Sequence, residues 1–128
     1  MRLLLDTHVL AWWPKDAPQL AAQHRDLIKA LENEVLVSAV SCWEIAIKVR
    51  TGKWPKAAGL VPGLANALTA TSMTLLPISG AHAERAGLLP HTHKDPFDRL
   101  LAAQALEDDL TLATVDPVFR TIPGLSIV

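Results

Sequence analysis

The stretch Arg2–Asp6, RLLLD, is a short apolar run that ends in an aspartate, and runs of this kind recur between longer helical patterns. This alternation decides the fold, because it is typical of βαβ units and a mainly parallel sheet. We therefore predict an α/β domain with helices on both faces of a five-stranded sheet. The expected strands are Arg2–Asp6, Val35–Ala39, Thr74–Ile78, Thr111–Thr114 and Leu125–Val128.

Helical periodicity fills the segments between these strands. Helices are expected at Gln19–Asn33, Ser41–Arg50, Leu60–Thr71 and Ala81–Leu88, and in the second half of His93–Leu106, HKDPFDRLLAAQAL. The two longer connections, rich in proline and glycine, are too short to indicate a second domain. We expect residues 1–128 to form a single domain.

Composition excludes several classes of protein. Half of the residues are hydrophobic and 20% are charged, and no window approaches the roughly 18 apolar residues of a membrane helix. The apolar run after Arg2 is too short for a signal peptide, so we expect a soluble, cytoplasmic protein. With Cys42 as the only cysteine, neither a disulfide within the chain nor a thiolate metal cluster can form.

Charge gives a weaker signal. The net charge of −1 provides no overall attraction for nucleic acid. One basic run without acids, which would form either a basic rim or an ordinary solvated face, contains Lys48, Arg50, Lys53 and Lys56.

Two aspartates follow predicted strands. Asp6 ends the first strand, and Asp116 comes just after the fourth, in TLATVD. In an open α/β sheet, polar groups past the carboxyl ends of strands converge on one crevice. Either residue could instead cap a following helix, and Asp116 precedes a proline, as an N-cap often does.

Glu44 allows two interpretations. It lies three residues after Ser41, which fits a capping box, and four before Lys48, which fits a surface ion pair. A helix that starts at Ser38 would instead place Glu44 in mid-helix, away from any cap.

Asp98 is the most informative acid. With Asp95 as N-cap and Pro96 as the first helical residue, Asp98 takes the third position, near the positive end of the helix dipole. At about 100° per residue it lies in phase with the apolar face, opposite a polar side made of Arg99, Gln104 and Glu107. Since a charge on an apolar face is costly unless it is paired or bound to a cation, Asp98 is predicted to face a metal ion.

Together, the four acids favour metal chemistry. Clustered carboxylates repel one another and would have raised pKa values unless a cation joined them. Hard oxygen ligands suit Mg²⁺ or Mn²⁺, which organise phosphate chemistry. The combination indicates phosphoryl transfer or phosphodiester hydrolysis at Asp6, Glu44, Asp98 and Asp116.

In this order, the segments LLLDTHV, VLVSAVSCWEIAIKVRTGK, HKDPFDRLLAAQAL and LTLATVDPVF resemble the PIN-domain ribonucleases known as VapC-type toxins. The resemblance covers nearly the whole chain. It implies a PIN-like domain and a Mg²⁺- or Mn²⁺-dependent endoribonuclease that cuts structured RNA, such as tRNA or ribosomal RNA, leaving a 5′ phosphate and a 3′ hydroxyl. It also implies a homodimer and a small antitoxin whose tail lies over the active site.

The resemblance extends to individual residues. The family's acidic positions match Asp6, Glu44, Asp98 and Asp116, with Asp6 and Asp98 as direct metal ligands, whereas Asp95 is assigned to capping. Thr7 and Thr114 resemble hydroxyls that hold a carboxylate or a metal-bound water, and strand-end hydrogen bonding explains them equally well. Candidate substrate contacts are Lys48, His91, His93, Arg99 and Arg120. Trp12, Trp13 and Trp54 are candidate antitoxin or dimer contacts, whereas Trp43 is expected in the core.

Rival functions make different demands on the sequence. A haloacid-dehalogenase-like phosphatase also binds Mg²⁺, but it has a second aspartate two residues after the first, where this chain has His8. A receiver-like module needs an aspartate after its third strand, and TLLPIS supplies none. A PIN domain that serves only as a scaffold for RNA or protein would be expected to lack one of the acids, and all four are present.

Overall fold

The computed structural model describes residues 1–128 and contains one parallel five-stranded sheet, in the order β3-β2-β1-β4-β5. The predicted α/β class and all five strands are confirmed. Each strand ends slightly before its predicted boundary, and the bounds are β1 Arg2–Leu5, β2 Glu34–Ser38, β3 Thr74–Leu76, β4 Thr111–Ala113 and β5 Ser126–Ile127.

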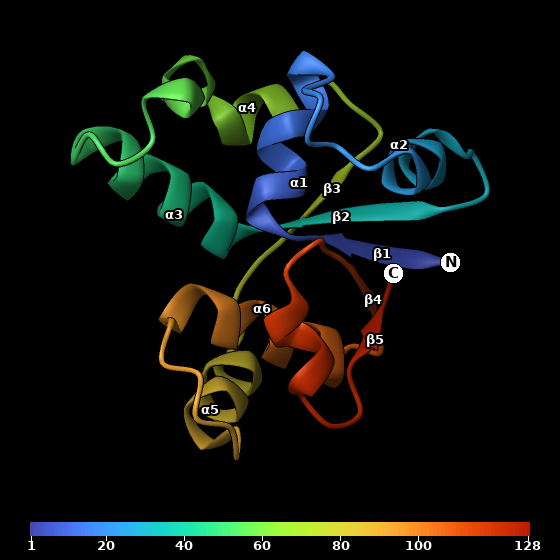
Figure 1. The fold of residues 1–128 in the computed structure, drawn as a ribbon, viewed down its shortest axis with the longest axis vertical. Coiled ribbons are helices and arrows are strands. Elements are labelled where there is room, and N and C mark those ends of the chain that lie inside the picture. Colours follow the sequence, from blue (N-terminus) through green and yellow to red (C-terminus); the bar gives the residue numbers. More distant parts are fainter.

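Helices cover both faces of this sheet (Figure 1). Helices α1 to α4 lie on one side, and α5, α6 and the short turn η3 lie on the other. No helix is long and apolar enough to cross a membrane. The α-helices are α1 Thr7–Trp12, α2 Ala22–Lys29, α3 Ala39–Arg50, α4 Leu64–Leu68, α5 Gly80–Leu88 and α6 Pro96–Glu107; the 3₁₀ helices are η1 Trp13–Lys15, η2 Pro55–Leu60 and η3 Pro117–Thr121.

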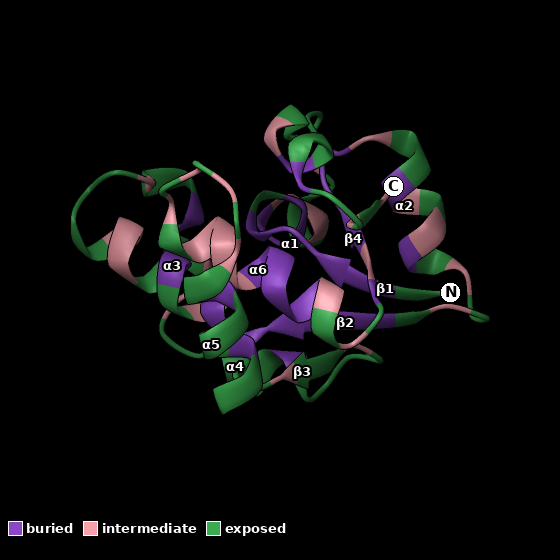
Figure 2. Cartoon of the chain, turned by 90° about the horizontal axis from the view of Figure 1, so that it is seen from below, coloured by how far each residue is buried: buried purple, intermediate pink, exposed green.

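The leucines of β1 explain why RLLLD specifies a central strand. Leu3 and Leu5 point into the hydrophobic cluster beneath α1 to α4, and Leu4 points into the cluster beneath α6. All three are fully buried, as the buried sheet in Figure 2 shows. Because helices cover both faces of this parallel sheet, successive residues of its central strand are apolar on both faces.

Capping decides where the two helices that carry acids begin. The Ser38 side chain accepts a hydrogen bond from the Val40 amide at 3.0 Å, so α3 starts after Ser38. Of the two predicted starts the earlier is therefore right, and Glu44 lies in mid-helix with 3% of its surface exposed. Asp95 caps α6 as predicted, by accepting from the amides of Phe97 and Asp98.

Two predictions about side-chain environment are wrong. Gln104 was placed on a polar side of α6, yet it is fully buried, because the sheet covers one side of this helix and α5 the other. Its side-chain oxygen accepts a 2.5 Å hydrogen bond from the Ser38 hydroxyl. Trp43 was placed in the core, yet it is 54% exposed and packs edge-on against Phe97 at the start of α6.

Candidate active site

The order of the strands brings two of the predicted acids to one edge of the sheet. The chain runs from β1 outward to β2 and β3, then returns to the other side of β1 as β4, so the switch point lies between β1 and β4. Asp6 directly follows β1, and Asp116 follows β4. Asp6 is buried and caps α1, whereas Asp116 is exposed and caps η3.

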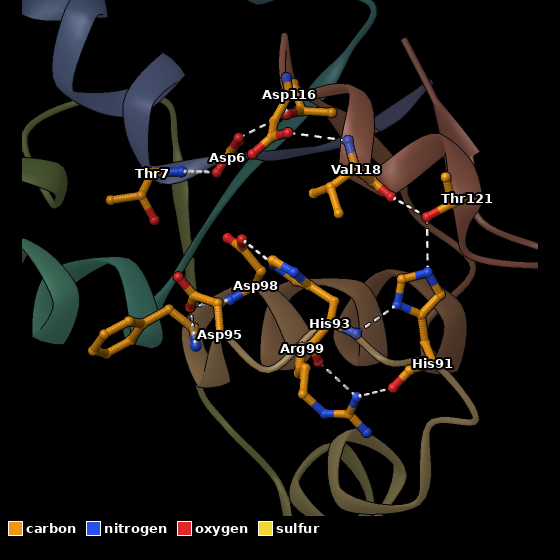
Figure 3. A network of polar contacts seen from close by, with 12 residues as sticks. Asp6, Thr7, His91, His93, Asp95, Asp98, Arg99, Asp116, Val118 and Thr121 are labelled. Atoms are coloured by element: carbon orange, nitrogen blue, oxygen red, sulfur yellow. Dashed lines mark hydrogen bonds and ion pairs between the residues drawn. The ribbon is translucent and has the colours of Figure 1, made fainter.

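Hydrogen bonds hold the Asp6 carboxylate in a fixed orientation (Figure 3). One oxygen accepts from the Thr7 amide at 2.7 Å, and the other accepts from the Thr114 hydroxyl at 2.7 Å. The Thr114 hydroxyl oxygen also accepts from the Asp116 amide at 3.0 Å, so it joins the loops that carry both acids. The Thr7 hydroxyl instead bonds to Ser41 at 2.9 Å, so Thr7 supports the site through its backbone.

Asp98 lies across from Asp6, at the third position of α6 (Figure 3). Its carboxylate is 2.7 Å from Nε2 of His93, and 16% of its side chain is exposed. Burial raises the pKa of Asp98 to about 6, and the negative charges of Asp95 and Asp6 contribute to this rise, while the hydrogen bond to His93 opposes it. The contact of His93 with the site is therefore its hydrogen bond to the Asp98 carboxylate.

Glu44 brings a third carboxylate from α3. It is buried and forms a 2.5 Å ion pair with Lys48, one turn further along the helix. Burial also raises the pKa of Asp6, and the charge of Glu44 contributes to that rise, whereas the Thr114 hydrogen bond opposes it. Asp6 thus interacts electrostatically with both Glu44 and Asp98.

The structure gives Arg99 a role that differs from the prediction. Its guanidinium donates to backbone oxygens at all five N–H positions, so the interpretation of Arg99 as a phosphate contact is wrong. The acceptors are the carbonyls of Ala86, Gly87, Leu89, His91 and His93. Arg99 therefore shapes the loop that presents His93 to Asp98.

The remaining candidates make no direct contact with the four acids. His91 contacts the Thr121 hydroxyl at 2.7 Å and accepts from the His93 amide, so the two histidines are not arranged as a ligand pair. Arg120 is exposed on η3. Trp12, Trp13 and Trp54 are half-buried against the core beneath α1 to α4.

The chemistry of the acids fits a hard divalent cation. All the candidate ligand atoms are carboxylate oxygens, which suit Mg²⁺ or Mn²⁺ better than softer metals. The buried Asp6 carboxylate bonds only to neutral donors, Thr7 and Thr114, and has no cationic side chain as a partner. No three histidine, cysteine or acidic side chains are grouped closely enough here to hold a metal ion by themselves.

Asp98→Asn is expected to stabilise the metal-free protein. Because the pKa of Asp98 lies above its ordinary value of 3.8, the folded state binds this proton more tightly than the unfolded state does. This contribution to stability is fully present below that ordinary value and is lost as the pH rises through about 6. Asparagine does not titrate, so the variant should gain roughly 1–2 kcal/mol above neutral pH, with the gain shrinking on acidification.

Thermal unfolding in chelator over a range of pH would measure this effect. A difference in stability that is independent of pH would contradict the proposed burial of a charged Asp98. Asp109→Asn is a suitable control, because Asp109 lies on the surface after α6, away from these acids.

Comparisons with known proteins agree with this fold. The sequence profile of the family described as PIN domain matches residues 3–125. Ribonuclease VapC22 of Mycobacterium tuberculosis is 29% identical to this chain over 120 residues, which cover 93% of this chain and 90% of that protein.

Solved structures match over nearly the whole chain. VapBC2 from Rickettsia felis, bound to a DNA fragment from its promoter, gives a TM-score of 0.72 at 19% identity and covers 100% of this chain and 98% of its own. FitAcB from Neisseria gonorrhoeae gives 0.69 at 23% identity, with coverage of 98% and 95%. VapC20 of M. tuberculosis, described as a Sarcin-Ricin loop cleaving toxin, gives 0.68 at 14% identity, with coverage of 94% and 95%. At these identities the similarity is one of fold.

Proposed function

From the premise that this chain belongs to the PIN-domain family, we propose that it is a metal-dependent endoribonuclease of the VapC type, the toxin of a toxin–antitoxin pair. The observation that carries the proposal is the meeting of acids from separate elements at the switch point of the sheet. Asp6 follows β1, Asp98 lies in the first turn of α6, and the charge of Asp6 contributes to the raised pKa of Asp98. Such a crevice is where open α/β sheets bind their ligands.

Each acid has a role in this proposal. Asp6 and Asp98 are the direct ligands of a Mg²⁺ or Mn²⁺ ion, and Glu44 and Asp116 complete its surroundings directly or through water. A bound ion would activate the attacking water and neutralise charge on the phosphate. Thr114 keeps the Asp6 carboxylate oriented, and His93 restrains Asp98 until substrate and metal are in place.

The substrate and partners follow from relatives and are proposals for this chain. A relative of the same fold cleaves the sarcin–ricin loop, and we propose a structured RNA, such as ribosomal RNA or tRNA, as the substrate. Several structural neighbours are toxin–antitoxin complexes, so we propose a cognate antitoxin, a toxin homodimer and an assembly of both. The half-buried tryptophans Trp12, Trp13 and Trp54 are the proposed antitoxin contacts.

Purified protein is expected to cut structured RNA when Mg²⁺ or Mn²⁺ is added, to stop in chelator, and to recover when metal is restored. The control is Asp98→Asn protein, purified in parallel, which should fold and fail to cut. RNA products should carry 5′ phosphates, which can be measured by ligation. Equal cleavage by both proteins would point to a contaminating nuclease and would contradict the role of Asp98.

A further inference from the structure

Three aromatic rings pack together beside the acids. The His8 ring, on the exposed side of α1, lies 4.7 Å from the Trp54 ring, with the planes inclined by 35°. It also lies 5.6 Å from the ring of Trp12, one turn along the same helix. Both tryptophans are half-buried, so packing holds them in place, whereas the His8 ring is exposed and accessible to a ligand.

A groove opens beside this cluster. It has a volume of about 340 Å³ and is lined by Trp12 and Trp54 together with two lysines, Lys15 and Lys56. The Lys15 ammonium donates to the backbone carbonyl of Lys56, which ties the two walls together. Aromatic rings and two lysines thus lie side by side along this groove.

The groove is connected to the candidate active site through Lys48. Its ammonium forms the 2.5 Å ion pair with Glu44 and lies 5.9 Å from the centre of the Trp54 ring. His8 is two residues from Asp6 in the chain, in the first turn of α1. The aromatic cluster therefore lies next to the candidate active site.

We propose that the accessible edge of this aromatic cluster, where the His8 ring lies beside the groove, binds one nucleobase of the RNA substrate next to the phosphate that is cut. The base stacks on the aromatic surface of His8 and Trp54, while Lys15 and Lys56 in the groove attract the adjacent phosphates. Stacking on aromatic side chains combined with nearby cations is how proteins hold single-stranded and looped RNA. The proposal rests on the proposed ribonuclease function and adds a base-binding subsite to it.

The charge of the groove favours RNA over an apolar peptide. An amphipathic helix binds a groove through apolar contacts. Lysines beside the groove would add to its affinity only if the helix carried acidic side chains. Lysines beside aromatic rings suit a ligand that combines flat bases with phosphates. The alternative is that only a protein partner occupies the groove, and the binding experiment distinguishes this from RNA binding.

Two matched pairs of substitutions test the stacking, each made together with Asp98→Asn so that no probe is cut. His8→Ala and Trp54→Leu remove an aromatic face, whereas His8→Phe and Trp54→Phe keep one. His8 lies on the surface, so its substitution avoids the core contacts of Trp54. The probes are a labelled oligouridylate and the same ribose-phosphate chain without bases, with binding measured by fluorescence anisotropy.

The Asp98→Asn protein should bind the probe with bases about tenfold more tightly, the effect of one base–aromatic stack. His8→Ala and Trp54→Leu should remove this preference without changing binding of the abasic chain, and both Phe variants should keep it. An unchanged preference in the Ala and Leu variants, as expected for a groove used only by a protein partner, would overturn the proposal. If the natural protein cuts no RNA with metal, the nuclease function fails instead, whatever the base preference.

Discussion

Asp6→Asn is expected to reduce metal-dependent RNA cleavage by about 10³-fold or more while the protein remains folded. The Asp6 carboxylate is buried at the switch point, and neutral donors, Thr7 and Thr114, fix its direction. Asparagine has nearly the same shape: its oxygen can accept from the Thr7 amide, and its nitrogen can donate to the Thr114 hydroxyl, which then reverses its role. It lacks the charge that binds a cation. The loss should therefore appear in metal affinity and rate, and not in folding.

Initial rates on a labelled RNA over a series of metal concentrations would measure this effect. Thr114→Val leaves the charge of Asp6 but removes its hydroxyl partner, so a smaller loss of about 10- to 100-fold is expected. Lys94→Ala, at an exposed position near the site, should change little. If the Asp6→Asn protein kept its full rate and metal dependence, Asp6 would not be a ligand.

Arg99→Met is expected to destabilise the protein by about 2–4 kcal/mol. The substitution keeps much of the apolar length but removes donors to five backbone carbonyls between Ala86 and His93. Some of those carbonyls regain water, so the loss is smaller than the sum of five charged hydrogen bonds. Arg99→Lys should recover little, because one ammonium group cannot reach carbonyls spread around a planar guanidinium.

Arg85→Met is the matched control for that experiment. Arg85, on the neighbouring helix α5, makes one exposed ion pair with Glu107, at 2.8 Å, and such pairs contribute at most about 1 kcal/mol. Urea denaturation of the three variants beside the natural protein would measure the free energies of unfolding. Similar losses of stability for Arg99→Met and Arg85→Met would mean that the five Arg99 hydrogen bonds stabilise the protein no more than one exposed ion pair does.

The sequence predicted the sheet and the start of α6 because those features depend on local patterns. RLLLD has three consecutive leucines, as a strand covered on both faces requires, and Asp95 and Pro96 specify the start of α6 without help from the rest of the chain. The half-buried position of Asp98 also followed from its phase on the helix. These features could be predicted one segment at a time.

Other features depend on segments that meet only after folding. The periodicity of α6 assigns Arg99 and Gln104 to a solvent-facing side, but α5 covers that side. The sequence of α6 alone cannot predict this contact. Helix α1 is too short for its periodicity to stand out, so the stacking of His8 on Trp54 went unseen. An arginine and a glutamine on the supposed polar side of a helix give no signal of such contacts.

The bond between Ser38 and Gln104 has an evolutionary consequence. The Ser38 hydroxyl accepts from the Val40 amide at the start of α3 and donates to Gln104 within α6, so one atom connects the helices that carry Glu44 and Asp98. Loss of either partner would leave a buried polar group unsatisfied. Positions 38 and 104 should therefore covary in related proteins, although neither residue is one of the four acids.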